Sequence, residues 1–224
     1  MRQHIPNILT CFNLLCGCLG IIFCLEERSL PAAYFVWAAA IFDFFDGFAA
    51  RMLKVNSPIG KELDSLADVV SFGVLPAMVM YKMMTQATQS TWLPYAAFFI
   101  AAFSALRLAI FNVDERQRDS FRGLNTPANT LFITSLPLLM FDWLHQEWVL
   151  VAITLIFSLL LVSPFEFFAF KFKNFSWSDN KLRFTFIAIS VFLVMALKIT
   201  AVPIIILLYI LTSLSGNVVS AQKK

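Results

Sequence analysis

The chain has 224 residues, of which 59% are hydrophobic and only 14% are charged, against about 25% charged residues in a typical soluble domain. This composition excludes an ordinary soluble globular protein and indicates an integral membrane protein. The net charge of +3 is small and the basic residues lie between apolar runs, so the sequence lacks the basic patch that nucleic-acid binding requires.

Eight apolar stretches predict membrane-spanning helices, because a helix needs about 20 apolar residues to cross a bilayer. They cover residues 5–25, 30–50, 66–84, 92–112, 126–141, 148–162, 184–200 and 202–215. Only Lys198 and Pro203 separate the last two, so a short re-entrant pair is an alternative there. The pattern predicts an all-α membrane protein with a single membrane-embedded domain over residues 1–224.

The basic residues predict the orientation, since Lys and Arg are enriched in cytoplasmic loops. With the N-terminus inside, thirteen of the 17 fall on the cytoplasmic side: Arg2, Arg51, Lys54, Lys61, Arg116, Arg118, Arg122, Lys171, Lys173, Lys181, Arg183, Lys223 and Lys224. Arg28, Lys82 and Lys198 fall outside, and Arg107 lies within a helix. We therefore expect eight spanning helices with both termini in the cytoplasm.

Four carboxylates stand out between residues 43 and 68, at the ends of two apolar stretches where isolated charge is costly. Asp43 and Asp46 are three residues apart, and Asp64 and Asp68 are four apart, so each pair shares one face of a helix. The turn residues between the pairs are Asn56, Ser57, Pro58 and Gly60. They predict that the two helices return antiparallel and that all four acids converge.

Four hard oxygen ligands without a Cys or His pattern favour Mg²⁺, Mn²⁺ or Ca²⁺ over Zn²⁺, and two ions would neutralise the mutual repulsion of the acids. Small residues accompany the acids at Gly47, Ala49, Ala50 and Gly60. Arg51 offers a planar fork suited to phosphate. Together they indicate a site for a lipid that carries a diphosphate. The alternative is that Asp43 and Asp46 cap or salt-bridge helices while Arg51 and Lys54 reach to the interface.

A family resemblance rests on these positions. Asp43, Asp46, Gly47, Ala50, Arg51, Gly60, Asp64 and Asp68 reproduce every fixed position of DxxDGxxARx8GxxxDxxxD, the signature of the CDP-alcohol phosphotransferases. Residues 5–10 resemble the opening segment of that family, and its phosphatidylserine synthase branch is resembled by residues 60–77, 104–112, 121–124 and 126–128. The likeness spans roughly the first 130 residues. Two positions depart from the branch: Ile110 stands where it often has a basic residue, and Asn125 where it often has proline.

The resemblance implies transfer of the phosphatidyl group of CDP-diacylglycerol to the hydroxyl of L-serine, with release of CMP. It implies that Asp43, Asp46, Asp64 and Asp68 bind Mg²⁺ or Mn²⁺, that Asp68 is the general base, and that displacement is in line without a covalent intermediate. Gly47, Ala50, Arg51 and Gly60 are implied to bind the nucleotide, with Asn7 and Thr10 as further candidates. A homodimer in a bacterial plasma membrane, with the site facing the cytoplasm, is also implied.

Other residues leave alternatives open. Asn7 and Thr10 could instead cap the first helix. Arg107 lies within a predicted helix, on its cytoplasmic half, and is therefore expected to face a polar cavity and to bind the serine carboxylate or the lipid phosphate. The alternative is an ion pair with one of the acids. Arg122 is a loop candidate for the same role.

Three other functions compete with this reading. A sister phosphotransferase would use another acceptor, such as glycerol phosphate, inositol phosphate or a second phospholipid. A divalent-cation transporter would place acids along a path near the midplane. A silent membrane scaffold gives no reason for the eight motif positions.

Overall fold

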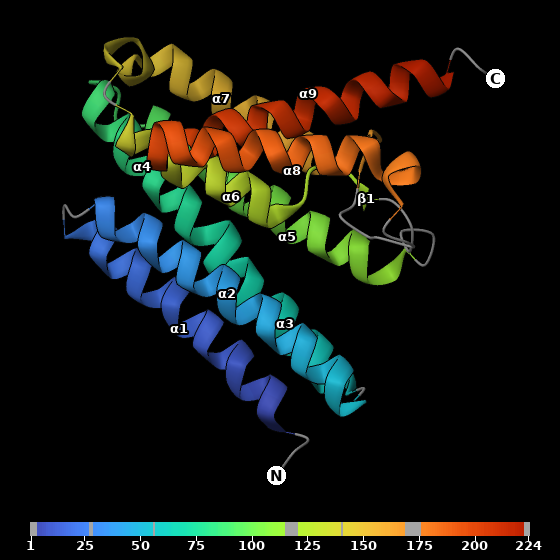
Figure 1. Ribbon diagram of the computed structural model, residues 1–224. Helices are drawn as coiled ribbons and strands as arrows, with labels where there is room; N and C mark the ends of the chain where they lie inside the picture. The colour runs from blue at the N-terminus through green and yellow to red at the C-terminus, as the bar shows by residue number, and fades with distance from the viewer. Residues whose placement is uncertain are drawn as a thin grey trace.

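The computed structural model describes residues 4–26, 29–55, 57–114, 121–139, 141–168 and 176–221. They form an almost entirely helical protein (Figure 1), which confirms the all-α expectation. The α-helices are α1 (Ile5–Leu25), α2 (Ser29–Leu53), α3 (Pro58–Asp68), α4 (Leu75–Ala87), α5 (Phe98–Val113), α6 (Thr126–Ser135), α7 (Glu147–Leu161), α8 (Trp177–Leu197) and α9 (Ala201–Ala221). Short 3-10 helices are η3 (Leu93–Ala97), η5 (Leu136–Leu138), η6 (Asp142–His145) and η7 (Lys198–Thr200), and η2 (Val69–Val74) is a π-helix.

Five helical segments of the described chain are long and apolar enough to cross a membrane: Ile5–Leu25, Ala32–Leu53, Pro58–Ala87, Leu93–Val113 and Asn180–Ser215. The third joins α3, η2 and α4, and the fifth joins α8, η7 and α9. Helix α6 has 10 residues, or about 15 Å at 1.5 Å per residue, and α7 is a shorter apolar helix. Several residues used to predict turns and orientation lie outside the described residues: Arg2, Arg28, Asn56, Arg116, Arg118, Lys171, Lys173, Lys223 and Lys224.

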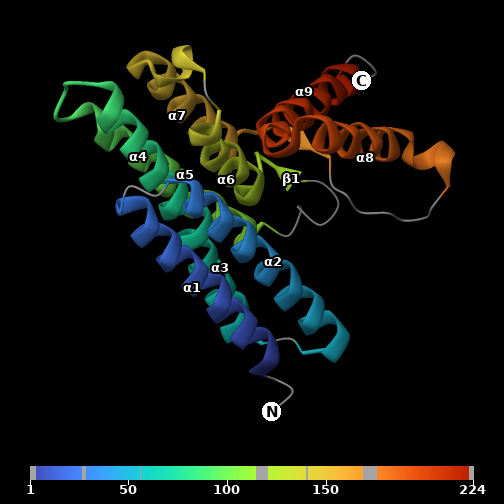
Figure 2. The same cartoon turned by 60° about the vertical axis from the view of Figure 1, so that its left-hand side comes forward.

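The helices form two groups. Helices α1, α2 and α3 run side by side, and α8 and α9 lie on the far side of the molecule from α1 (Figures 1 and 2). The chain reverses at Lys198, which has a positive φ of 53°, so α8 and α9 pack together as antiparallel neighbours. The last two apolar stretches are therefore separate helices, and α9 packs against α6.

The π-helix η2 follows directly after Asp68 and is held by α6. Pro76 has no N–H to donate to the carbonyl four residues earlier, at Phe72. The Thr130 hydroxyl of α6 donates to that carbonyl at 2.6 Å. A side chain from a neighbouring helix thus satisfies the backbone group that proline leaves free, as membrane helices require. This contact fixes the helix immediately beyond two of the acids.

Helix α1 approaches η2 closely. Its buried face carries Pro6, Thr10, Asn13, Gly17, Gly20 and Cys24, spaced three or four residues apart. A Cβ on Gly17 would lie 2.9 Å from the Cα of Ser71, a contact that only glycine allows. Small residues at such crossings let two membrane helices touch through their backbones. The approach brings Thr10 and Asn13 level with the acids of α2 and α3.

A two-stranded ribbon links the loop before α6 to the segment after α7. Strand β1 (Phe121–Arg122) pairs antiparallel with β2 (Glu166–Phe167), with Arg122 opposite Glu166. After β1, Gly123 has a φ of +78°, and its N–H donates to the Phe165 carbonyl at 2.9 Å. A Cβ on Gly123 would lie 2.1 Å from the Leu161 carbonyl oxygen. Glycine is therefore required where the ribbon meets the end of α7.

Replacement of Gly123 by Ala should lower the free energy of unfolding by more than about 2 kcal/mol, because the left-handed backbone and the overlap with Leu161 both disfavour a side chain. Thermal unfolding in detergent measures the loss. Gly47→Ala is the matched control, since a Cβ at Gly47 meets no atom within 4 Å. Equal unfolding temperatures for the two variants would contradict the prediction.

Candidate active site

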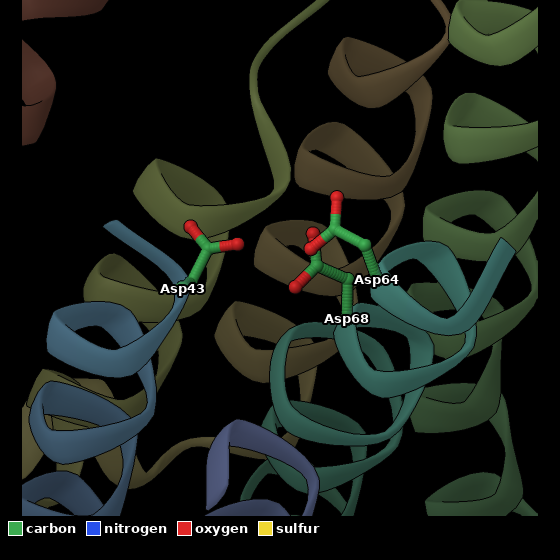
Figure 3. Close-up of side chains that lie close together, drawn as sticks. All are labelled: Asp43, Asp64 and Asp68. Atoms are coloured by element: carbon green, nitrogen blue, oxygen red, sulfur yellow. The ribbon is translucent and has the colours of Figure 1, made fainter. Parts of the chain in front are cut away.

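Three carboxylates meet between α2 and α3. Asp43 projects from α2, and Asp64 and Asp68 project from α3 toward the same space (Figure 3). One oxygen from each of the three lies within 4.8 Å of the others. Helix α3 begins at Pro58, with the Ser57 hydroxyl accepting the Gly60 N–H at 3.3 Å. Asp64 and Asp68 therefore lie within α3, which begins eight residues before the apolar stretch predicted for residues 66–84.

Asp46 occupies a neighbouring position. It lies one turn from Asp43 on α2, is buried, and accepts a hydrogen bond from the Thr10 hydroxyl at 2.7 Å. It is not one of the three acids whose oxygens lie within 4.8 Å of one another. The structure thus brings three of the four predicted ligands together and places the fourth beside them, tied to α1.

These acids fit a divalent cation. Asp68 is 8% exposed, and the Oδ1 atom of Asp64 is buried without a hydrogen-bond partner. Close buried carboxylates repel one another unless a cation or a proton lies between them. An all-oxygen set of this kind suits hard cations such as Mg²⁺ and Mn²⁺. Asp43, Asp64 and Asp68 could hold such an ion, with Asp46 close by.

A cavity of about 230 Å³ opens on the α1 side of the acids. Its walls are Pro6, Asn7, Thr10, Asp46, Gly47, Ala50, Val55, Ser57, Gly60, Lys61 and Asp64. Five of the six residues predicted to bind a nucleotide are in this set. The sixth, Arg51, is exposed and does not line the cavity. The alternative of helix capping fails for Asn7 and Thr10, because both lie inside α1, whose N-cap is His4.

The two glycines that line this cavity have different roles. A Cβ on Gly47 would meet no atom within 4 Å, so a side chain there would occupy the cavity. A Cβ on Gly60 would lie 3.1 Å from the Asn7 side-chain oxygen. Glycine at residue 60 therefore lets α3 approach α1.

A second cavity, of about 240 Å³, lies on the other side of the acids. Asp64, Asp68 and Arg107 all line it. Arg107 is only 7% exposed, and its Nη1 donates to the Thr126 hydroxyl at 3.3 Å. The guanidinium lies 5.1 Å from the Phe111 ring centroid, and Nε is buried without a partner. Asp68, across the same cavity, attracts the charge of Arg107. Within the described ranges no direct ion pair joins Arg107 to an acid, so the guanidinium can still bind an anion.

Arg122 lines a third cavity, of about 280 Å³, which shares Arg107 as a wall. Ile110, one of the two departures from the branch, lines it too. The C-terminal helix supports this region: the Tyr209 hydroxyl donates to the Phe168 carbonyl at 3.0 Å, and its ring lies 5.8 Å from that of Phe167 in β2. Helix α9 thus buttresses the ribbon that carries Arg122.

The other departure, Asn125, has a structural role. Its side-chain oxygen accepts the Ala128 N–H at 2.8 Å and caps α6, a function for which asparagine is well suited. Asn125 also lines the cavity of Arg107 and Asp68. The substitution therefore preserves the start of α6 at Thr126, the residue that Arg107 contacts.

Two contacts near the acids were not anticipated. Asn13 donates to Asp68 at 3.0 Å, and the Lys61 ammonium donates to the Asn112 carbonyl near the end of α5 at 2.9 Å. Asn13 follows Thr10 by three residues on one face of α1, and it is a polar residue in an apolar run. That position in the sequence indicates that Asn13 faces the acids. No pattern in the sequence indicates the contact of Lys61 with Asn112.

Comparison with known proteins points the same way. The family model described as CDP-alcohol phosphatidyltransferase matches residues 3–162. A Bacillus subtilis protein named CDP-diacylglycerol–serine O-phosphatidyltransferase is 33% identical over 173 residues, covering 75% of this chain and 92% of that protein. A protein of the same name from Helicobacter pylori is 29% identical over 212 residues, covering 92% and 87%.

A Mycobacterium leprae protein of that name is 35% identical over 172 residues. The match covers 72% of this chain but only 57% of the mycobacterial protein, so the chain spans little more than half the length of that relative. The signature acids, the cavities beside them and the family match over residues 3–162 together show that the chain belongs to the CDP-alcohol phosphatidyltransferase family.

Proposed function

We propose that this protein is a CDP-diacylglycerol–serine O-phosphatidyltransferase. The observation that carries the proposal is that three carboxylates stand between two cavities, one lined by the motif residues of the signature and the other by Arg107. A two-substrate transfer needs such an arrangement, with each substrate on its own side of the reacting phosphorus. Relatives named for this reaction in several bacteria and in Methanocaldococcus jannaschii support it.

We assign the residues around the acids to nucleotide binding and to metal binding. Asn7, Thr10, Gly47, Ala50 and Gly60 would enclose the cytidine diphosphate, with Arg51 near its outer end. Asp43, Asp46, Asp64 and Asp68 would hold one or two Mg²⁺ or Mn²⁺ ions. When bound, such an ion neutralises charge on the diphosphate and on the departing CMP. Positioning and charge stabilisation of this kind supply most of the catalysis in phosphoryl transfer.

The acceptor would occupy the cavity shared by Asp68 and Arg107. Asp68 would take the proton of the serine hydroxyl while the serine oxygen forms a bond to the lipid-side phosphorus and the bond from that phosphorus to CMP breaks. Arg107 would bind the serine carboxylate with charge-assisted hydrogen bonds. Arg122, in the neighbouring cavity, is a second candidate for the carboxylate or for the lipid phosphate.

The finer topology belongs to the same proposal. A single domain would cross the plasma membrane eight times, with α6 extended by η5 and with α8 and α9 as a hairpin. Both termini and the acids would then face the cytoplasm, as the distribution of Lys and Arg predicts. A homodimer is proposed from the family resemblance alone.

The test is an incubation of purified protein with CDP-diacylglycerol, Mg²⁺ or Mn²⁺ and a panel of acceptors, in which CMP release and the lipid product are followed. We expect phosphatidylserine with L-serine only, and no product after removal of the metal with a chelator. CMP release with glycerol phosphate or inositol phosphate instead would make the protein a sister enzyme. The absence of CMP release with every acceptor would contradict the proposal.

Replacement of Gly47 by Val should raise the KM for CDP-diacylglycerol by about tenfold or more, because the side chain would fill part of a cavity of about 230 Å³ and displace the nucleotide. The KM for serine should stay within about twofold, since Gly47 lies on the other side of the acids. Initial-rate kinetics with each substrate varied in turn measure both constants. An equal rise in both would show that the variant disturbs the whole site.

A further inference from the structure

We propose that Asn13 is a positioning residue, which orients the carboxylate of Asp68 through a hydrogen-bond chain that ends at the hydroxyl of Ser71. The inference rests on the proposed function, in which Asp68 is the general base that takes the proton of the acceptor hydroxyl. It adds a residue of α1 that lies outside the eight positions of the family signature.

The chain is continuous from α1 to η2. The Asn13 amide nitrogen donates to Asp68 Oδ1 at 3.0 Å, and the Ser71 hydroxyl donates to the Asn13 amide oxygen at 2.6 Å. Asn13 and Ser71 are both fully buried. Both the nitrogen and the oxygen of the amide therefore have a partner within the protein.

The Asp68 carboxylate fixes which way the amide faces, because it can only accept. If the amide were turned over, its oxygen would lie against the Asp68 carboxylate, and two acceptors would repel each other. The Ser71 hydroxyl also lies 2.7 Å from the Ala67 carbonyl oxygen. A hydroxyl has one hydrogen, which Ser71 shares between these two acceptors.

The backbone holds these groups at this distance. Gly17 is one turn beyond Asn13, and its missing Cβ lets α1 touch Ser71. Ser71 stands in the π-helix, which the Thr130 hydroxyl secures from the other side. A π-helical turn beside a functional group is a recurrent way of re-aiming side chains. The contact between Asn13 and Asp68 thus depends on Gly17 and on the π-helix, neither of which is proposed to contact a substrate.

The consequence concerns the orientation of Asp68. The bond from the amide occupies Oδ1 and fixes the plane of the carboxylate, so Oδ2 is the oxygen that we expect to take the acceptor's proton. Asp68 lines the cavity of Arg107, whereas Asn13 is not among the described residues that line that cavity or the nucleotide cavity. Asn13 therefore acts through Asp68 and touches neither proposed substrate. Its loss should lower kcat and leave both KM values nearly unchanged.

The test compares Asn13→Leu with the wild type, because leucine has the same number and branching of heavy atoms and removes both hydrogen bonds. We expect kcat to fall about 10- to 100-fold, as for other residues that orient a catalytic or metal-binding group. Ser71→Ala keeps the Asn13 bond to Asp68 and removes only the partner of the amide oxygen, so it should give a smaller loss. The double variant should be no slower than Asn13→Leu alone, since the chain is already broken.

Thr154→Val is the matched control, because the buried Thr154 hydroxyl donates to the Leu150 carbonyl of α7 at 2.8 Å, outside the site. Thr154→Val should lower the unfolding temperature about as much as Asn13→Leu does and should leave kcat unchanged. An unchanged kcat in Asn13→Leu, a rise in KM alone, or additive losses in the double variant would each overturn the inference. If Asn13→Leu fails to fold, the kcat of Ser71→Ala decides. A wild-type protein that releases no CMP overturns the proposed function instead, and the inference with it.

Discussion

Replacement of Asp68 by Asn should lower the rate of CMP release by about 10³- to 10⁴-fold, because one change removes a general base and a negative charge from the metal site. Asparagine has nearly the same shape, and its oxygen can still accept the hydrogen bond that Asn13 donates at 3.0 Å. The variant should therefore fold as the wild type does. CMP release at saturating substrates and the unfolding temperature in detergent measure the two outcomes.

A comparison with Asp64→Asn separates the two roles of Asp68. Both variants should bind Mn²⁺ more weakly, which titration of the bound ion by electron paramagnetic resonance would show. At saturating Mn²⁺ the rate should recover in part for Asp64→Asn but not for Asp68→Asn. Asp142→Asn is the control, because Asp142 is an exposed acid of η6 and lines neither substrate cavity. Recovery of more than about a tenth of the wild-type rate in Asp68→Asn would contradict its role as the base.

The site was largely predictable because its determinants are local. The spacings of Asp43 and Asp46, and of Asp64 and Asp68, fix one face on each helix, and Pro58 with Ser57 marks where α3 begins. These features depend on residues three or four apart in the sequence. The six nucleotide residues were implied by the family resemblance instead, and five of them line one cavity.

What the sequence could not supply depends on contacts between distant segments. The separate position of Asp46 follows from its bond to Thr10, 36 residues away. The bonds of Asn13 to Asp68 and Ser71 span 55 and 58 residues, and they require the close crossing of α1 and η2 at Gly17. No local pattern in the chain specifies that crossing.

Two of the helices differ in length from the apolar stretches that predicted them. Residues 126–141 are apolar enough for a long helix, but Pro137 cannot donate an N–H, and the α-helix gives way to the 3-10 turn Leu136–Leu138. The helix that contains Asp64 and Asp68 is longer than its apolar stretch, because its first turns are polar. Counting apolar residues thus lengthened α6 and shortened α3.

Replacement of Arg107 by Ala should raise the KM for serine by about 10²- to 10³-fold, because two charge-assisted hydrogen bonds to the carboxylate are worth about 3–4 kcal/mol together. The side chain is buried, and its Nε has no partner in the described part of the protein, so the loss should fall on the ligand more than on the fold. Arg107→Lys should recover only part of the affinity, since lysine keeps the charge but lacks the planar fork.

Ethanolamine, which is serine without its carboxylate, distinguishes the two anions that Arg107 could bind. If Arg107 binds the serine carboxylate, the wild type should prefer serine strongly and Arg107→Ala should lose that preference while its rate with ethanolamine stays unchanged. If Arg107 binds the lipid phosphate, the KM for CDP-diacylglycerol should rise with either acceptor. Lys181→Ala, a charge removed from the exposed surface of α8, is the control. An arginine that binds either anion must affect the KM for serine or the KM for CDP-diacylglycerol. Unchanged kinetics in Arg107→Ala with both acceptors would therefore show that Arg107 binds neither anion.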